Sequence, residues 1–254
     1  MPVYSLIIHT NTSRYTRVPG CGILITPDQE TADLLYRYLQ THPKGENFTE
    51  LTKLERPSKQ VWQMRSNGDS IYARVEKINH PDIAMDDDNR FACLPGNIYV
   101  YGTGEFPSIP LIPHDSSPAP LNRGEFLIRR YGFPDFYWSY RDFDSRIVIC
   151  DRPTVFRIEL VDSKIGTETV GTPILIASDK VYITAITATG EHKVSYTVLD
   201  DDLWCRGDLK ASEARTAASV FRFGAFHRGF TSSGGYVKYC QGKDLAAEEW
   251  ELVV

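Results

Sequence analysis

Residues 124–162, GEFLIRRYGFPDFYWSYRDFDSRIVICDRPTVFRIELVD, contain four successive segments with the composition of short β-strands. Each segment is rich in β-branched and aromatic residues, and Gly, Pro, Asp or Ser residues stand near its ends. The four predicted strands occupy residues 125–132, 135–142, 145–151 and 154–162. Four strands joined by short turns indicate an antiparallel unit rather than a layered α/β unit.

The same pattern recurs along the rest of the chain. Five further predicted strands occupy residues 3–10, 70–78, 97–102, 172–178 and 180–187. Residues 26–41 instead carry helix signals, because Thr26 can cap a helix, Pro27 suits its first turn, and apolar residues follow at helical spacing. Residues 209–221 are a second helix candidate with a less regular apolar stripe. This organisation predicts an all-β protein, a barrel or a β-sandwich, with its helices in insertions.

The chain has 254 residues, a length that fits one large domain or two small ones. Residues 105–121 contain five prolines, so this segment cannot form a central strand or a helix. We interpret it as a surface excursion and as the candidate internal linker. The sequence therefore predicts one β-rich domain over residues 1–254, with residues 26–41 and 105–121 as insertions. A split near residues 105–121 is the alternative.

Composition narrows the classes of partner. The formal net charge is −5, and the sequence shows no basic stripe of the kind that duplex-binding proteins carry, so nucleic acid is not expected as a partner. The apolar runs are too short for a membrane span, and the first residues lack the pattern of a secretory signal. We therefore expect a cytoplasmic protein. The five cysteines are scattered, which disfavours a disulfide framework and a Cys-based zinc site.

Three segments end in a similar aromatic strand. They are Gln60-Val61-Trp62, Val155-Phe156 and Glu249-Trp250. The interval from Trp62 to Phe156 equals the interval from Phe156 to Trp250. Equal spacing of similar segments is the signature of internal repetition, and it predicts three repeats that each close with an aromatic strand.

This arrangement resembles the β-trefoil family. In that family each four-stranded repeat tends to close with a Q-x-W-type strand, whose aromatic side chain enters a shared core. Gln60-Val61-Trp62 matches the motif literally, and the other two segments match it in degenerate form. The chain is long for a single trefoil. The resemblance therefore implies large insertions, for which residues 26–41, 105–121 and 203–235 are the candidates.

Two branches of the family come into consideration. Ricin-B-like lectins place an Asn near the closing strand, and that Asn is absent before all three closing segments here. Residues 17–22, Arg-Val-Pro-Gly-Cys-Gly, and residues 57–62 resemble segments of the fungal mycocypins, which inhibit cysteine proteases. That resemblance implies a loop that enters the protease cleft. Small residues allow a close approach of the backbone, and a proline reduces the entropy lost on ordering.

The loop implied by the mycocypin resemblance consists of Pro19, Gly20, Cys21 and Gly22. The alternative for these residues is a tight turn between two strands.

The aromatic run within residues 131–143 offers a second candidate site. Strand alternation sends Trp138 and Tyr140 to one face of the predicted strand and Tyr137 to the other. One face must then pack in the core, while the other can present a stacking platform for a sugar. Tyr137, Trp138 and Tyr140 are therefore the candidate glycan-binding residues.

The enzyme alternative draws its acid and base groups from Arg141, Asp142, Asp144 and His227. None of the common hydrolase, nucleotide-binding or zinc-protease motifs is present. His80-Pro81-Asp82 is half of a facial iron triad, and we interpret it as a turn. The sequence thus predicts no cofactor and no metal. It predicts a non-enzymatic binding protein, in the sharpest version a cysteine-protease inhibitor, with a glycan-binding lectin and an enzyme with an aromatic-lined pocket as alternatives.

Overall fold

The computed structural model describes eleven segments of the chain, which are residues 2–11, 20–43, 50–67, 71–79, 93–94, 96–102, 119–161, 170–196, 206–212, 219–240 and 248–254. The chain divides into two compact units. Unit 1 consists of Met1–Ala119 and Lys164–Ile176, and unit 2 consists of Pro120–Ser163 and Ala177–Val254. The first boundary between them lies within the Pro-rich segment 105–121.

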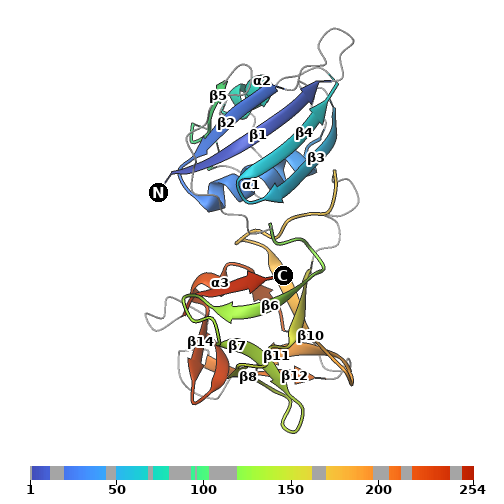
Figure 1. Ribbon diagram of the computed structural model, residues 1–254, viewed down its shortest axis with the longest axis vertical. Coiled ribbons are helices and arrows are strands. Elements are labelled where there is room, and N and C mark those ends of the chain that lie inside the picture. Colours follow the sequence, from blue (N-terminus) through green and yellow to red (C-terminus); the bar gives the residue numbers. More distant parts are fainter. Residues whose placement is uncertain are drawn as a thin grey trace. The chain divides into compact units, whose positions relative to one another are not determined.

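Unit 1 is a five-stranded mixed sheet with two helices (Figure 1). Its elements are β1 (Val3–Asn11), β2 (Gly20–Thr26), α1 (Gln29–Thr41), β3 (Leu51–Ser58), β4 (Val61–Ser66), α2 (Ile71–Ile78) and β5 (Tyr99–Gly102). The strand order is β3-β4-β1-β2-β5. Only the central β1–β4 pairing among these ladders is parallel. The sequence predicted β1, β5 and α1 close to their observed positions.

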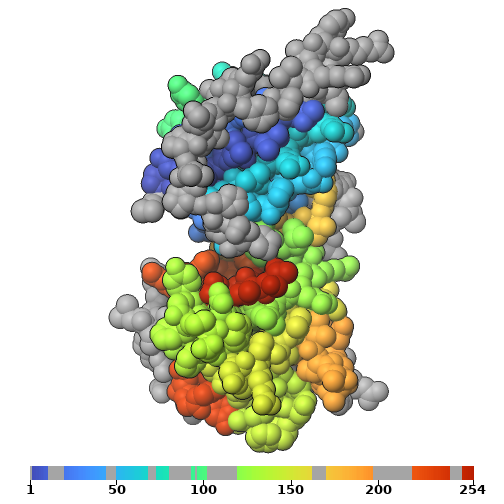
Figure 2. Space-filling model, viewed as in Figure 1, coloured from blue at the N-terminus to red at the C-terminus, as the bar shows by residue number. Residues whose placement is uncertain are grey.

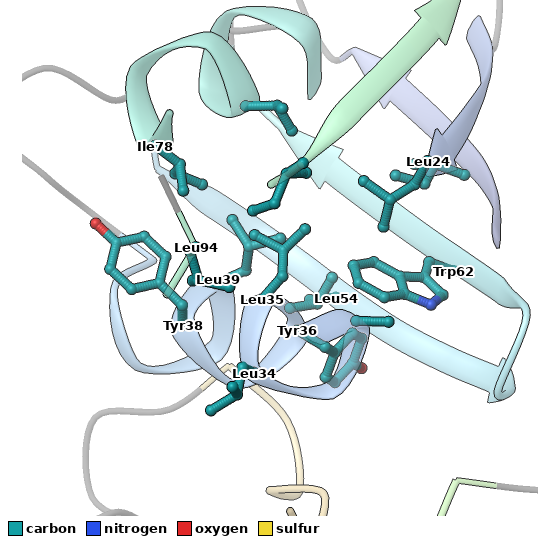
Figure 3. Packing of buried hydrophobic residues seen from close by; sticks show 14 of the residues in the cluster. Leu24, Leu34, Leu35, Tyr36, Tyr38, Leu39, Leu54, Trp62, Ile78 and Leu94 are labelled. Atoms are coloured by element: carbon teal, nitrogen blue, oxygen red, sulfur yellow. The ribbon is translucent and has the colours of Figure 1, made fainter. Parts of the chain in front are cut away.

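Helix α1 forms the core of unit 1 with the sheet. Asp28 caps it by accepting a hydrogen bond of 2.8 Å from the Thr31 backbone N–H, two residues after the predicted cap. Leu35 and Leu39 of α1 are fully buried against sheet residues such as Trp62 (Figure 3). The segment 170–176 returns to this unit, where the Gln40 side chain donates to the Thr172 carbonyl at 2.9 Å.

The predicted strand at residues 70–78 is wrong, because Ile71–Ile78 forms α2. Its β-branched and aromatic composition favoured a strand, but its buried side chains have helical spacing. Arg74, Val75 and Ile78 are each at most 3% exposed. Residues separated by three and four positions share one face of a helix, and this face packs on the core of unit 1.

Unit 2 consists almost entirely of strands. They are β6 (Gly124–Arg130), β7 (Tyr137–Arg141), β8 (Arg146–Cys150), β9 (Val155–Leu160), β10 (Lys180–Thr187), β11 (Gly190–Tyr196), β12 (Arg206–Ser212), β13 (Phe221–Arg222), β14 (Phe230–Ser233), β15 (Tyr236–Cys240) and β16 (Trp250–Val253). One short helix, α3 (Ala225–Arg228), lies between β13 and β14. The four strands predicted within residues 124–162 are all present as β6 to β9.

The strand pairing of unit 2 is that of a β-trefoil-like barrel. The first and last strands of each repeat are joined, through β6–β9, β10–β13 and a bridge between Phe230 of β14 and Glu248 beside β16. The repeats are linked to one another by β9–β10 and β16–β6. The hairpin strands β8, β12 and β15 also pair with each other, which forms a second layer. The protein is therefore mainly β, as predicted.

Aromatic side chains fill the barrel. Trp138 is fully buried, and its ring centroid lies 5.8 Å from Phe156, 4.9 Å from Phe230 and 5.7 Å from Trp250. Phe156 and Trp250 thus have the core positions predicted for closing strands. The closing strand of the middle repeat carries Phe221, which is 1% exposed.

The predicted repeat is wrong at its first member. Trp62 lies on β4 of unit 1, where its ring packs edge-on against Tyr36 at 5.2 Å. The equal spacing of Trp62, Phe156 and Trp250 is therefore a coincidence, because the three repeats all lie in unit 2.

Two other predicted elements also differ from the structure. Within residues 209–221, predicted as a helix, the structure has the end of β12 and the start of β13. Residues 172–178 were predicted as a strand, and none of the named strands covers them. Ile174 and Ile176 are buried in the core of unit 1 instead. A run of apolar residues can be buried without forming a strand, so such a run does not by itself identify one.

We expect Trp138→Ala to lower the free energy of unfolding of unit 2 by about 3–5 kcal/mol, because it removes a buried indole from a closely packed core. Phe143→Ala is the matched control, since Phe143 is 82% exposed and its removal leaves no cavity. Urea unfolding followed by near-ultraviolet circular dichroism measures both effects. An unchanged unfolding midpoint for Trp138→Ala would contradict the placement of this side chain in the core.

Candidate functional site

The glycine-containing segment predicted as an inhibitory loop lies largely within the sheet of unit 1. Gly20, Cys21 and Gly22 begin β2 and pair with β1, and Gly22 also pairs with Gly102 of β5. Cys21 is only 5% exposed, and burial raises the pKa of its thiol. Pro19 lies outside the described residues. Backbone that is paired within a sheet cannot enter a protease cleft as a projecting loop, so the structure places Cys21 and Gly22 away from the predicted role.

The three predicted sugar-binding aromatic residues occupy different environments on β7. Trp138 is a core residue, so its ring is unavailable to a ligand. Tyr140 is half-buried, and its ring stacks on His192 at a centroid distance of 4.7 Å. Tyr137 is also half-buried, and it is the register partner of Arg129 on β6. These three residues do not form one exposed platform.

The predicted acid and base residues form an ion pair at the β7–β8 turn rather than a catalytic pair. Arg141 donates to Asp144 through Nε at 3.0 Å and to the Tyr236 hydroxyl at 3.0 Å. Hydrogen bonding from Arg141 lowers the pKa of the Asp144 carboxyl, which is the wrong direction for a general acid at neutral pH. His227 lies on α3 and contacts Glu249 at 3.3 Å. Asp142 lies in the same turn.

Three exposed aromatic residues of unit 2 lie together on a neighbouring turn. Residues 131–136, which we call the aromatic turn, connect β6 to β7. Tyr131 is 61% exposed, and Phe133 and Phe136 are each 45% exposed. The rings of Phe133 and Phe136 meet edge-to-face at a centroid distance of 5.7 Å. Figure 2 shows the segment from β6 to β9, in yellow-green, as a continuous part of the visible surface of unit 2.

Backbone hydrogen bonds hold the aromatic turn in one conformation. Within the turn, the Phe133 N–H donates to the Arg130 carbonyl at 3.1 Å and the Phe136 N–H donates to the Phe133 carbonyl at 3.2 Å. The Tyr131 N–H donates to the Glu249 carbonyl at 2.9 Å, which ties the turn to the chain before β16. Gly132 has a φ of +76°, a conformation that L side chains rarely adopt. The three aromatic side chains therefore extend from a fixed backbone.

Charged side chains beside the aromatic turn are paired. The Arg130 guanidinium lies 4.4 Å from the centroid of the Phe133 ring and 3.2 Å from the Glu248 carboxylate. Arg129 contacts Glu251 at 2.8 Å, and this hydrogen bond is the main cause that raises the pKa of Arg129. The surface of the aromatic turn thus presents exposed aromatic rings next to guanidinium groups, which donate hydrogen bonds, and carboxylate groups, which accept them.

The aromatic turn lies in the same aromatic-rich stretch as the predicted sugar-binding residues but consists of other residues. Tyr131, Phe133 and Phe136 belong to the same aromatic run as Tyr137 and Trp138. The Gly and the Pro between the first three aromatic residues distinguish the residues of the turn from those of strand β7. These two residues mark a turn, where side chains are exposed, before the strand begins.

The described part of the chain holds no group of three or more His, Cys, Asp or Glu side chains arranged to bind a metal ion. The His80-Pro81-Asp82 segment lies outside the described residues. Among the described helices, none has both the length and the apolar character needed to cross a membrane.

No protein-family model matches this chain, and no curated protein matches it. Similar solved structures include the botulinum neurotoxin type G receptor binding domain, with 8% identity, a TM-score of 0.38, and coverage of 61% of this chain and 52% of that chain. The botulinum neurotoxin serotype D binding domain has 11% identity, a TM-score of 0.33, and coverage of 48% and 30%. A mutant of "HCR/D" has 9% identity, a TM-score of 0.39, and coverage of 55% and 44%.

The chain spans about half, or less, of the length of these structures. TM-scores this low do not by themselves define a shared fold. The description of unit 2 as β-trefoil-like therefore rests on its own strand pairing.

We expect iodoacetamide to alkylate Cys21 at least roughly ten-fold more slowly than Cys93 in the folded protein, because Cys21 is buried in the sheet and Cys93 is exposed. Peptide mass spectrometry after timed quenching measures both rates. In urea the two rates should converge. Equal rates in the folded protein would instead show that the segment beginning β2 is open, as the inhibitor hypothesis requires.

Proposed function

We propose that unit 2 is a non-enzymatic carbohydrate-binding module and that the aromatic turn is its contact surface. The observation that carries this proposal is the exposure of Tyr131, Phe133 and Phe136 on one hydrogen-bonded turn, while other aromatic residues of the same unit, such as Trp138 and Phe156, are buried. Large apolar side chains that remain exposed together on an ordered surface are typical of an interaction site.

Aromatic rings suit sugars because a pyranose has one face made largely of C–H groups. The face of an aromatic ring carries partial negative charge, so it attracts the weakly positive hydrogens of those groups. The neighbouring polar groups complete the match. Arg130 can donate hydrogen bonds to sugar hydroxyls, and the exposed carboxylates of Asp135 and Glu249 can accept them. A few placed polar groups around apolar contacts give a binding site its specificity.

The fixed backbone of the aromatic turn also favours binding. A ligand that meets a preorganised surface loses less free energy to the ordering of protein groups than one that meets a mobile loop. Here the turn is bonded to itself through Arg130 and Phe133 and to the chain before β16 through Glu249. Binding residues are often found on connecting segments that a rigid scaffold holds in place.

The other hypotheses have less support. A cysteine-protease inhibitor stays a proposal, and it would need a different contact surface because Cys21 and Gly22 are paired on β2. Within the enzyme alternative, Asp144 is disfavoured as a general acid, because the hydrogen bond from Arg141 lowers the pKa of its carboxyl. A protein partner for the aromatic turn is an outcome that the experiment below distinguishes.

We expect the wild-type protein to be retained by a subset of glycans on an immobilised array. Phe133→Ala and Tyr131→Ala should weaken binding to those glycans by roughly three- to ten-fold each, because each removes a ring that stacks on the sugar. Phe143→Ala is the matched control. Phe143 is even more exposed, at 82%, but it lies in the β7–β8 turn, so its removal should leave retention unchanged.

Calorimetric titration of one retained glycan supplies the dissociation constants. The proposal fails if no glycan retains the protein, or if Phe143→Ala weakens binding as much as Phe133→Ala. A parallel titration into a papain-type protease separates the classes. Stoichiometric inhibition without any glycan retention would replace this proposal with the inhibitor hypothesis.

A further inference from the structure

A second surface of unit 2 has a different chemistry. An open pocket of about 600 Å³ is lined by residues of β10, β13, β15 and α3. Three cationic side chains line it, those of Lys180, Arg222 and Arg228. No aspartate or glutamate is among its lining residues. The pocket is thus a local concentration of positive charge on a chain whose formal net charge is −5.

Two of these cations oppose each other directly. In the antiparallel β10–β13 ladder Lys180 is the register partner of Arg222, so both side chains leave the same face of the sheet. Like charges in directly opposed positions destabilise a sheet. A register that places them together therefore carries an electrostatic penalty, which a bound anion would remove.

Neither these two residues nor Arg228 forms an ion pair with a described carboxylate. Other arginines of unit 2 behave differently, since each of the following contacts a carboxylate within 4 Å: Arg129, Arg130, Arg141 and Arg157. Four arginines of unit 2 are thus neutralised by carboxylates, whereas the three cations around this pocket have no carboxylate partner among the described residues.

The backbone that carries these cations is tightly packed. The Gly224 N–H donates to the Ala177 carbonyl at 2.9 Å, and the Cys240 N–H donates to the Gly229 carbonyl at 2.7 Å. A Cβ atom added at Gly229 would lie 2.5 Å from the Ala225 Cβ. Such close packing restricts movement of the α3 segment, so Arg228 is held beside the pocket by its backbone.

Tyr239 adds a neutral donor to the pocket. Its ring is buried in the aromatic core, 5.1 Å from Phe221, and Tyr239 is one of the residues that line the pocket. Burial raises the pKa of this phenol, so its proton stays in place at physiological pH. A protonated hydroxyl beside three cations can donate to an oxyanion but adds no negative charge of its own.

We propose that this pocket binds a tetrahedral oxyanion, a phosphate or sulfate ester carried on a small cyclic molecule. Three cations and one hydroxyl match the several acceptor oxygens of such a group, and arginine is well suited to binding two of them at once. Val220 lines the same pocket and is 39% exposed, so it supplies an apolar contact for the ring that bears the ester. The volume of about 600 Å³ is in the range of small-ligand sites.

Calorimetric titration tests the proposal with four probes compared at the same ionic strength: inorganic phosphate, inorganic sulfate, glucose 6-phosphate and glucose 6-sulfate. We expect saturable binding. In a second series at higher potassium chloride concentrations binding should weaken, because exposed charges are screened by salt. The two sugar esters should bind more tightly than the inorganic ions. Whichever ester binds more tightly identifies the phosphorylated or the sulfated class of ligand.

Arg222→Gln and Arg228→Gln should each weaken binding of the preferred ester about ten-fold or more, because each removes a charged hydrogen-bond donor. Arg228 lies outside the sheet, so its variant keeps the ladder intact. Arg152→Gln is the matched control. Arg152 is exposed in the same unit but is not among the residues that line the pocket, and its variant should bind normally. Near-ultraviolet circular dichroism confirms that each variant is folded.

Thermal unfolding gives an independent readout. In buffer without phosphate or sulfate, Arg222→Gln should unfold at a higher temperature than the wild type, because it relieves the repulsion from Lys180. At the same concentration, added ester should raise the unfolding midpoint of the wild type more than that of the variant. The proposal is overturned if no probe binds saturably, or if Arg152→Gln weakens binding as much as Arg222→Gln. Phe133→Ala should leave ester binding unchanged, so this result is independent of the aromatic turn.

Discussion

The packing of one indole, that of Trp138, organises unit 2. Its ring contacts aromatic residues from the first and third repeats, Phe156 and Trp250, and also Phe230, at centroid distances of 4.9–5.8 Å. These contacts join strands that are far apart in the sequence, so they can form only when the barrel closes. Burying such large apolar surfaces supplies much of the free energy that offsets the entropy lost on ordering the chain.

Trp138 lies on β7 and faces inward, whereas Tyr131, Phe133 and Phe136 lie on the turn that precedes β7 and are exposed. Backbone hydrogen bonds to the carbonyls of Arg130 and Glu249 hold this turn. The β10–β13 register brings two cations together at the pocket. One scaffold thus presents two surfaces of different chemistry. Charges are paired around the aromatic turn, whereas three cations around the pocket have no carboxylate partner among the described residues.

Much of the fold could be predicted from local patterns. The strands within residues 124–162 and 180–187 and the helix that ends at Thr41 have a clear period, with turn or capping residues at their ends. One strand prediction was wrong because residue composition and the spacing of the buried residues favour different elements. Residues 70–78 have strand-like composition, yet Arg74, Val75 and Ile78 are buried at helical spacing. The predicted repeat of aromatic strands was wrong at Trp62. Segments that share three similar residues at equal spacing do not necessarily belong to one structural unit.

The sequence by itself determined the mainly β character of the chain, the location of its aromatic run and the Pro-rich segment in which the first boundary between units falls. These features depend on residues that are neighbours in the chain. Only the tertiary structure decided that Cys21 is covered within a sheet, that Trp138 is buried while Phe133 is exposed, and that Lys180 faces Arg222. Each of these depends on which distant strands pair and in what register. A one-residue shift in register reverses the face of every side chain in a strand, and no local pattern records that choice.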